Sequence, residues 1–397
     1  MKKVFACLLL VSLLLTLVGC ASSQGNKQPS TNMIANNATP TTVPISASTA
    51  KPTTTPTTEN TTAPTTQSTT VPTTQPTSDP TTQITTTVPT TAPTTKPTTK
   101  PTTVTTKPTV QPNPASDFEY VISEKGGYVT IDGYVGTAKN VVVPNHIEGL
   151  PVRGVSLKGN KTIESIVLPD TYETIYMEAF MSCSNLRSVV LGKNVALINP
   201  SAFSHCTKLE SISFPASLET IGDGAFMCCT GLKSVSFANG LKEIDTGAFS
   251  YCENLEKAIL PIGLETIGNE AFAYCTGLKE VFIPKTVRFK GTNNFLGAEA
   301  LTSLTFEDGT TRIGSYAAFM GASSLKQVTI PASVTEICDM TFSACPKLET
   351  VIFLGSAPEK VGGKVFGTPN KDIQIIYNPS TSGWDDTPLS EFNLVPM

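Results

Sequence analysis

Residues 202–270 read AFSHCTKLESISFPASLETIGDG, AFMCCTGLKSVSFANGLKEIDTG and AFSYCENLEKAILPIGLETIGNE, three consecutive segments of equal length without an insertion or deletion. A fourth copy begins at Ala271 with AFAYCTGLKEVFIP. Self-similarity at such a period is typical of a solenoid, in which one supersecondary unit stacks on copies of itself. One copy cannot bury its own apolar face, so we expect the copies to share a continuous core.

One phenylalanine marks the register of the repeat along the rest of the chain. It recurs once in every unit, and Leu157 holds the same position one unit earlier: Phe180, Phe203, Phe226, Phe249, Phe272, Phe295, Phe319, Phe342 and Phe366. Apolar residues follow six, nine and eleven positions later, as at Leu209, Ile212 and Phe214. The period of two at the end of this series predicts a strand, and Pro215 ends it because proline cannot donate a ladder hydrogen bond.

The remainder of each unit predicts a turn. A second apolar pair follows 15 and 18 positions after the phenylalanine, as at Leu218 and Ile221. The Ala-Phe-x-x-Cys segment has a three-residue apolar spacing with a glycine such as Gly231 beyond it, which favours a short α or 3-10 turn. The predicted fold is an α/β-type repeat solenoid with units of about 23 residues, parallel strands on one face and short helical or 3-10 turns on the other.

One unit departs from the pattern. Lys290 stands where isoleucine is usual, 18 positions after the phenylalanine, and Asn293-Asn294 replaces the Gly-Ala pair that opens other units. The unit that begins at Phe295 is also longer by a single residue than the units before it. We expect a local kink or bulge in the stack at this point.

Residues 1–20 are predicted to be a lipoprotein leader. Lys2 and Lys3 precede an apolar run that is too short for a membrane span, which needs roughly 20 residues. The run ends in Leu-Val-Gly-Cys at Cys20, which resembles the bacterial lipobox, whose cysteine is lipidated on sulfur and becomes the mature N-terminus. More than one acyl chain gives stable anchoring. An ordinary cleaved signal with an incidental cysteine is the alternative.

Residues 21–116 repeat the triplet Pro-Thr-Thr with few large apolar side chains. Such a segment cannot offset its own ordering entropy, and frequent proline favours extended polyproline II. We predict a disordered stalk that lifts the following domain from a membrane. Threonine beside proline is a substrate for O-linked sugar, and an unmodified spacer is equally compatible with this composition.

The remaining sequence divides into a cap, the repeats and a closing segment. Residues 117–156 alternate apolar and polar side chains around Gly126-Gly127, which predicts a hairpin in an N-terminal cap of short strands. Residues 157–353 hold the solenoid, and residues 354–397 an atypical last repeat with a C-terminal cap. The formal net charge of the whole chain is −4. The leader contributes a charge of +2 and the stalk +3, so residues 117–397 carry a net charge of −9. This charge argues against a nucleic-acid partner, which needs a basic patch.

The AFxxCxxLxxVxFP units between Ala179 and Phe353 resemble the BspA-like leucine-rich repeat family of bacterial surface proteins. The cap FEYVISEKGGYVTIDGYVG with GLPV is similar as well, as is the ending SAPEKVGGKVF, IIYNP and Gly383-Trp384. The resemblance implies a right-handed solenoid with a parallel sheet on its concave side. It also implies adhesion or protein binding at the cell surface and supplies no catalytic residues.

Six cysteines lie three residues after the register phenylalanine: Cys183, Cys206, Cys229, Cys252, Cys275 and Cys345. We call them the ladder cysteines. Ala298 and Ala322 take the same slot, so the position favours a small apolar group and predicts buried free thiols. Disulfides between adjacent units and a metal site are weaker alternatives. Cys228 and Cys338 fall off this ladder and are expected to be more exposed.

Catalysis is not predicted. The only histidines are His146 and His205, and the sequence has no metal-binding His or Cys motif and no phosphate-binding loop. We therefore expect no enzyme activity, cofactor or metal. A hydrolase that recruits one of these histidines remains the least favoured alternative.

Outward strand positions provide a candidate binding face. They are small and hydroxylated in the first units, whereas Ile259 and Phe282 stand out, flanked by Lys257 and Glu280. An exposed phenylalanine beside an isoleucine is typical of a contact patch. A second candidate is the turn row with His205, Tyr251 and Tyr274. Ordinary solvated surface is the alternative for both.

These features together predict an exported, lipid-anchored protein on the extracellular face of a bacterial membrane that binds a protein or glycan. A structural or scaffolding envelope protein without a discrete ligand is the alternative. The identity of the ligand, the face that binds it and the oligomeric state are not encoded in the repeat pattern.

Overall fold

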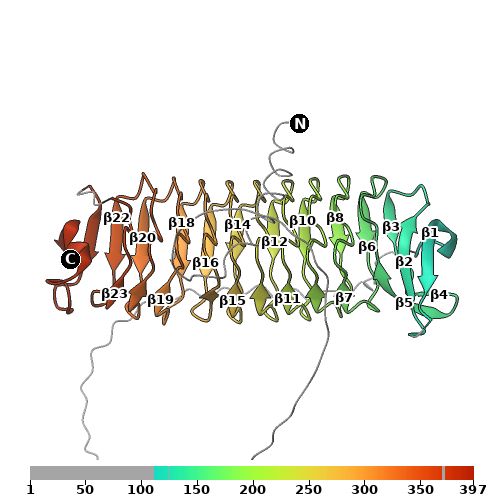
Figure 1. Ribbon diagram of the computed structural model, residues 1–397, viewed down its shortest axis with the longest axis horizontal. Helices are drawn as coiled ribbons and strands as arrows, with labels where there is room; N and C mark the ends of the chain where they lie inside the picture. The colour runs from blue at the N-terminus through green and yellow to red at the C-terminus, as the bar shows by residue number, and fades with distance from the viewer. Residues whose placement is uncertain (1–110, 125, 369–371) are drawn as a thin grey trace, which may run out of the picture. The chain divides into compact units, whose positions relative to one another are not determined.

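The computed structural model describes residues 111–124, 126–368 and 372–397. Residues 1–110, which include Cys20 and almost all of the Thr/Pro-rich block, therefore lie outside the described residues. The described chain forms a β-solenoid whose coils stack side by side in one row (Figure 1). Each coil has three sides: a longer strand, a two-residue strand and a turn segment.

The longer strands run parallel and in register along one side of the stack. They form three consecutive sheets, the last of which includes the closing strand β25. Their bounds are β3 (Asn140–Val142), β6 (Ser165–Val167), β8 (Ser188–Val190), β10 (Ser211–Ser213) and β12 (Ser234–Ser236), then β14 (Lys257–Ile259), β16 (Glu280–Ile283) and β18 (Ser303–Phe306), then β20 (Gln327–Ile330), β22 (Thr350–Phe353), β24 (Gln374–Tyr377) and β25 (Asn393–Pro396).

A second parallel ladder of two-residue strands follows the apolar pair that the sequence places after each long strand. It was not expected as a sheet. One six-stranded part holds β7 (Thr174–Ile175), β9 (Leu197–Ile198), β11 (Thr220–Ile221), β13 (Glu243–Ile244), β15 (Thr266–Ile267) and β17 (Arg288–Phe289). A three-stranded part holds β19 (Arg312–Ile313), β21 (Glu336–Ile337) and β23 (Lys360–Val361).

The third side is not helical, so the prediction of short helical or 3-10 turns is wrong. Within the described ranges only η1 (Ala115–Asp117) and η2 (Pro388–Glu391) are helical, and both lie outside the repeats. Ser201 and His205 have φ angles of 56° and 61°. A left-handed residue every fourth position interrupts the run of right-handed dihedrals that a helix needs.

Hydrogen bonding on this side explains the conformation. The amides of Phe203 and His205 donate to Ala225 and Met227 of the next coil at 2.7 and 2.8 Å, whereas that of Cys206 donates back to Phe203 at 3.1 Å. Every second amide in this segment therefore donates a hydrogen bond to the neighbouring coil, as in a ladder. The amides between them donate within their own coil and close tight turns. These two hydrogen-bond patterns together exclude a continuous helix.

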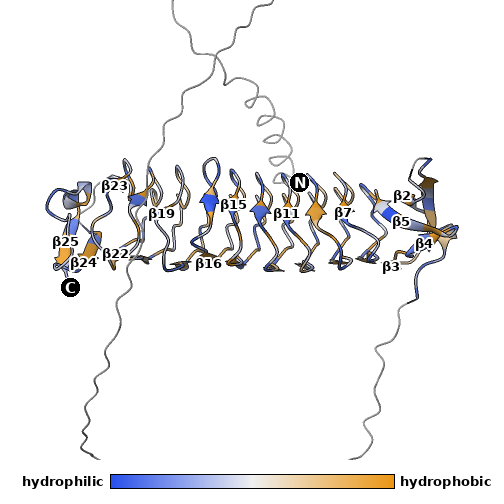
Figure 2. Cartoon of the chain, turned by 90° about the horizontal axis from the view of Figure 1, so that it is seen from below, coloured by the Kyte–Doolittle hydropathy of each residue, from blue (hydrophilic) through white to orange (hydrophobic). Residues whose placement is uncertain are grey.

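The register phenylalanines form the centre of the core, as predicted. Each is buried, and successive rings stack with centroids 4.9–5.7 Å apart from Phe180 to Phe366. Both apolar and polar residues occur along the coils (Figure 2). Because each ring contacts the rings before and after it, the core is continuous although no single coil encloses one.

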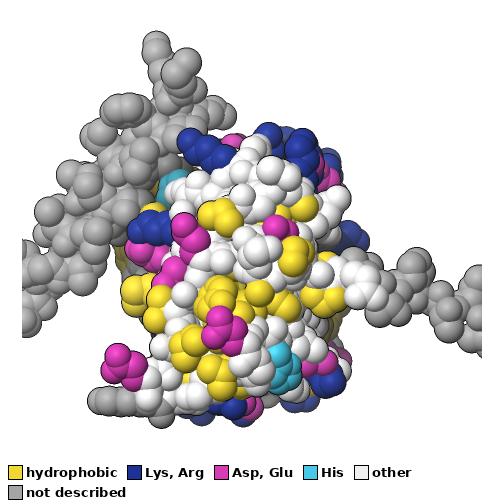
Figure 3. Space-filling view, turned by 90° about the vertical axis from the view of Figure 1, so that its right-hand side faces the viewer, with side chains coloured by type: hydrophobic (Ala, Val, Ile, Leu, Met, Phe, Trp, Pro, Cys, Tyr) yellow, Lys and Arg dark blue, Asp and Glu magenta, His cyan; other side chains and the backbone are white. Residues whose placement is uncertain are grey.

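Short strands lie at the N-terminal end of the stack. β1 (Phe118–Ile122), β2 (Val129–Tyr134), β5 (Leu150–Val155) and β4 (His146–Ile147) form a sheet in that order, with β1 and β2 antiparallel. In the end-on view, apolar side chains gather in the middle of this face and charged ones lie around them (Figure 3). At the other end, the Trp384 ring packs on Phe353 and Tyr377 with centroids 5.2 and 4.6 Å apart.

The irregular coil differs in detail from the sequence expectation. Phe289, not Lys290, occupies the isoleucine slot, because Ile267 pairs with Phe289 in the short ladder. The loop before Phe289 is therefore one residue shorter and the turn after it one residue longer. Lys290 instead forms an ion pair with Glu243, 2.6 Å away. The predicted irregularity is an interruption of the short ladder between β17 and β19.

Candidate binding surfaces of the repeat domain

The outer face of the long-strand ladder is the first candidate surface. In β10 and β12 its side chains are the exposed serines Ser211, Ser213, Ser234 and Ser236. One coil further on, Ile259 is 47% exposed and pairs in register with the half-buried Phe282. The sequence thus placed both side chains on the outer face, and the structure brings them together as neighbours in a mostly hydroxylated surface.

Lys257 and Glu280 lie beside this apolar pair. Their side chains form an ion pair with 2.6 Å between Nζ and Oε2. The hydrogen bond that Lys257 donates to the Glu280 carboxylate raises the pKa of Lys257. Both side chains are largely exposed, so the pair contributes little to stability. Its effect on the surface is to cancel two charges next to Ile259 and Phe282.

Tyr251 and Tyr274 lie on the turn segment rather than on the strand. Their rings stack with centroids 4.8 Å apart and planes inclined by 18°. Both residues have positive φ angles, 60° and 57°, which are uncommon for aromatic residues. In the next coil Gly297 takes the same position, and a Cβ there would lie 3.2 Å from the Tyr274 ring. The glycine therefore leaves room for that ring.

The ladder cysteines are buried, which confirms that their slot takes a small apolar group. Each thiol near the middle of the stack donates to a carbonyl of the preceding coil, as Cys229 Sγ does to Phe203 O at 3.1 Å. Burial raises the pKa of Cys229 and Cys275 to about 12. The expectation that Cys228 and Cys338 are more exposed is wrong, because both are buried. Cys338 Sγ accepts a bond from Arg312 Nη2 at 3.1 Å.

Replacing Cys229 with alanine should reduce the alkaline sensitivity of folding. The unfolded thiol ionises above its ordinary pKa of about 8.5 while the buried thiol stays protonated, so each such thiol removes about 1.4 kcal/mol of stability per pH unit in that window. We expect a small loss of stability at pH 7 that shrinks or reverses at pH 10. Urea unfolding with reductant present measures both values, and an equal difference at the two pH values would contradict the assignment.

The two histidines lie in different parts of the fold. His146 is exposed in the cap, and His205 lies in the turn of another coil. Nδ1 of His205 is 2.8 Å from the Ser204 hydroxyl, and the Ser204 side chain is buried. Burial lowers the pKa of His205. Among the described residues, no group of three or more His, Cys, Asp or Glu side chains is placed to hold a metal ion.

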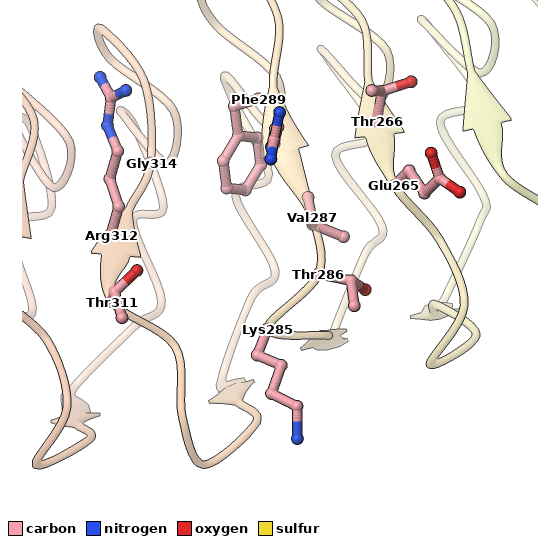
Figure 4. A pocket seen from close by; sticks show the side chains of 10 residues that line it. Glu265, Thr266, Lys285, Thr286, Val287, Phe289, Thr311, Arg312 and Gly314 are labelled. Carbon is pink, nitrogen blue, oxygen red and sulfur yellow. The ribbon is translucent and has the colours of Figure 1, made fainter. Parts of the chain in front are cut away.

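A cleft that sequence reasoning missed opens where the short ladder is interrupted. It has a volume of about 830 Å³ and is lined by Lys285, Arg288, Phe289, Arg312 and neighbouring residues. Figure 4 shows that β17 and β19, which flank it, are farther apart than β17 and β15. The only hint in the sequence was the irregular unit around Lys290.

The sequence matches the family described as "BspA type Leucine rich repeat region" in six copies, over residues 156–275 and 242–371. The matched residues span more than half of the chain, which therefore belongs to this family. The stacked, nearly helix-free coils show how that repeat is built here.

Several solved structures resemble the chain. A leucine-rich repeat protein of T. pallidum is 31% identical, with 48% of this chain and 91% of that protein covered and a TM-score of 0.45. The pneumococcal vaccine antigen PcpA is 19% identical, with 71% and 97% covered and a TM-score of 0.41. A leucine-rich cell surface protein of Faecalibacterium prausnitzii is 21% identical, with 61% and 88% covered and a TM-score of 0.30.

No curated protein sequence matches the chain. Within the part of the chain that the structure describes, no helix has the length and apolar character needed to span a bilayer.

Proposed function

We propose that this protein is anchored by lipid at Cys20 on the outer face of a bacterial membrane and that its repeat domain binds a protein or glycan. Support for the anchor comes from the apolar leader that ends in Gly19-Cys20. The Thr/Pro-rich block would hold the repeat domain away from the bilayer. Family membership supports an interaction role, since such repeats offer long surfaces on a core that does not depend on them.

The observation that carries the binding proposal is the adjacent Ile259 and Phe282. These two side chains form an apolar spot amid serine, threonine and a neutralised ion pair. A large apolar side chain at the centre of a polar rim is the usual form of an interface hot spot. Ile259 is not needed for the core, because it points outward from a strand whose middle residue, Ala258, is buried.

The double substitution Ile259→Ser and Phe282→Ser should weaken partner binding by about 10-fold or more, as loss of a hot spot does. Bacteria that display the full chain would be tested for adhesion to immobilised extracellular-matrix proteins and cell-wall glycans. Ser213→Ala on the same face is the matched control and should leave adhesion unchanged. Full adhesion by a correctly folded double variant would remove this patch from the proposal.

The stacked Tyr251 and Tyr274 support a second contact surface. Their flat aromatic faces beside Gly297 suit stacking against a sugar ring or an apolar side chain. If Tyr274→Ser abolishes adhesion where the strand-face variant does not, the turn row is the binding surface. If neither variant affects adhesion to any of these surfaces, the scaffolding alternative is favoured.

A further inference from the structure

The interruption between β17 and β19 leaves two strand edges that face each other. Elsewhere in the short ladder each coil bonds to the one before it, as when Arg288 N donates to Glu265 O at 2.8 Å and Lys290 N to Ile267 O at 2.7 Å. The equivalent amides one coil later belong to Arg312 and Gly314. Among the described residues neither makes a backbone bond to β17. The cleft therefore has amide donors on one wall and carbonyl acceptors on the other.

Phe289 lies at this interruption of the short ladder. It takes the slot that isoleucine fills in β15, and its larger ring lies edge-on to Phe295 and Phe319 with centroids 6.5 and 6.3 Å apart. The same two coils stay bonded on their other sides, through Glu307 N to Ile283 O at 2.9 Å and Asn293 N to Tyr316 O at 3.0 Å. The opening is thus held in place by a continuous scaffold.

Basic side chains outnumber acidic ones in the lining of the cleft, although the domain as a whole is acidic. Lys285, Arg288 and Arg312 line it, whereas Glu265 is its one acidic lining residue. Lys285 pairs with Glu307 at 2.9 Å and Arg312 with Glu336 at 3.4 Å. Arg288 is exposed and forms no ion pair within the described part of the chain. An anionic group that enters the cleft would meet this guanidinium, which binds carboxylates in bidentate geometry.

We infer that this cleft takes up an extended, acidic segment of a partner polypeptide, whose backbone pairs with β17 and β19 while a carboxylate side chain binds Arg288. Addition of a strand to an exposed edge is a general mode of peptide recognition. The volume of the cleft, about 830 Å³, lies within the range of ligand sites, about 300–1,000 Å³. The Thr/Pro-rich block of this chain is a poor occupant, since it carries +3 and its prolines lack amide donors. The inference concerns a surface separate from Ile259 and Phe282.

The test uses fluorescein-labelled, capped peptides with the sequence Val-Glu-Val-Asp-Val and the purified full chain, followed by fluorescence anisotropy. Two matched peptides separate backbone pairing from charge: one carries N-methyl groups on alternate amides, and the other has lysine at both acidic positions. Each should bind at least about 10-fold more weakly than the parent peptide, because each removes one of the two proposed interactions. Hydrogen exchange at the Arg312 and Gly314 amides should slow when the parent peptide is bound.

Protein variants complete the test. Arg288→Glu should weaken binding of the acidic peptide by about 10-fold or more, whereas Lys233→Glu, the same charge change on an exposed residue away from the cleft, should not. Phe289→Ile restores the usual side chain and should close the cleft to the peptide. The Ile259→Ser, Phe282→Ser variant should bind the peptide normally. The inference is overturned if no peptide binds, if N-methylation has no effect, or if a heparin hexasaccharide binds at Arg288 while peptides do not.

Discussion

Replacing Phe249 with alanine is expected to lower the free energy of unfolding of the repeat domain by about 3–5 kcal/mol. The side chain is fully buried, and its ring stacks on Phe226 and Phe272 with centroids 5.1 and 5.2 Å apart. Phe237 also meets it edge-on at 5.7 Å. The cavity would interrupt the aromatic ladder near its middle, where neighbouring coils cannot collapse without breaking their backbone bonds. Urea unfolding followed by circular dichroism gives the difference.

Phe282→Ala is the matched control, because it removes the same side chain from the half-buried outer face. It should cost clearly less than Phe249→Ala. In a solenoid, each coil is stabilised mainly by its neighbours, so hydrogen exchange should accelerate most in the coils next to residue 249. If both variants lost the same free energy of unfolding, the stacked phenylalanine rings would not be the main source of the domain's stability.

Asn294→Asp is expected to destabilise the domain by about 3–5 kcal/mol at neutral pH, the usual cost of an uncompensated buried charge. Asn294 is fully buried in the slot that alanine fills in other coils. Its Nδ2 donates to Gly268 O at 2.6 Å and to Lys290 O at 3.2 Å, and its Oδ1 accepts from Ser315 Oγ at 2.6 Å. A carboxylate would place a negative charge against both carbonyls.

The effect should depend on pH in a defined direction. Burial and the facing carbonyls would raise the pKa of the new carboxyl in the folded state above its ordinary value of about 3.9. The unfolded chain then releases its proton first, so stability falls as pH rises from about 4 toward the raised pKa. The melting temperature of the Asn294→Asp variant should therefore be closest to that of the unmodified protein at pH 4.5. It should lie furthest below that of the unmodified protein at pH 8.

Asn293→Asp is the control for this substitution. It makes the same chemical change one residue away, where the side chain is only partly buried and aspartate tolerates the positive φ of 57°. Its cost should stay within about 0.5 kcal/mol and vary little with pH. A similar, pH-independent cost for both variants would contradict the role assigned to Asn294.

Much of the candidate strand face could be predicted because strand side chains alternate strictly between two sides. Once Ala258 and Leu260 are assigned to the core, Lys257 and Ile259 must point outward. The same argument fails on the turn segment, where the left-handed residues break any simple period. For the same reason the sequence pattern did not predict the burial of Cys228, which lies in one of those left-handed positions. Strands of two residues are too short to show a period, so the second ladder was missed as well.

The sequence by itself determined the repeat, its register and the burial of every register phenylalanine, because a side chain that returns once in every unit lands at the same place in each coil. Only the tertiary structure decided how each coil closes, since that depends on which neighbouring coil receives each backbone amide. It alone also placed Phe289 in the isoleucine slot and opened the cleft between β17 and β19. The shift of Phe289 by one residue leaves the spacing of the register phenylalanines almost unchanged. It nevertheless coincides with the loss of the backbone hydrogen bonds that would join β17 to β19.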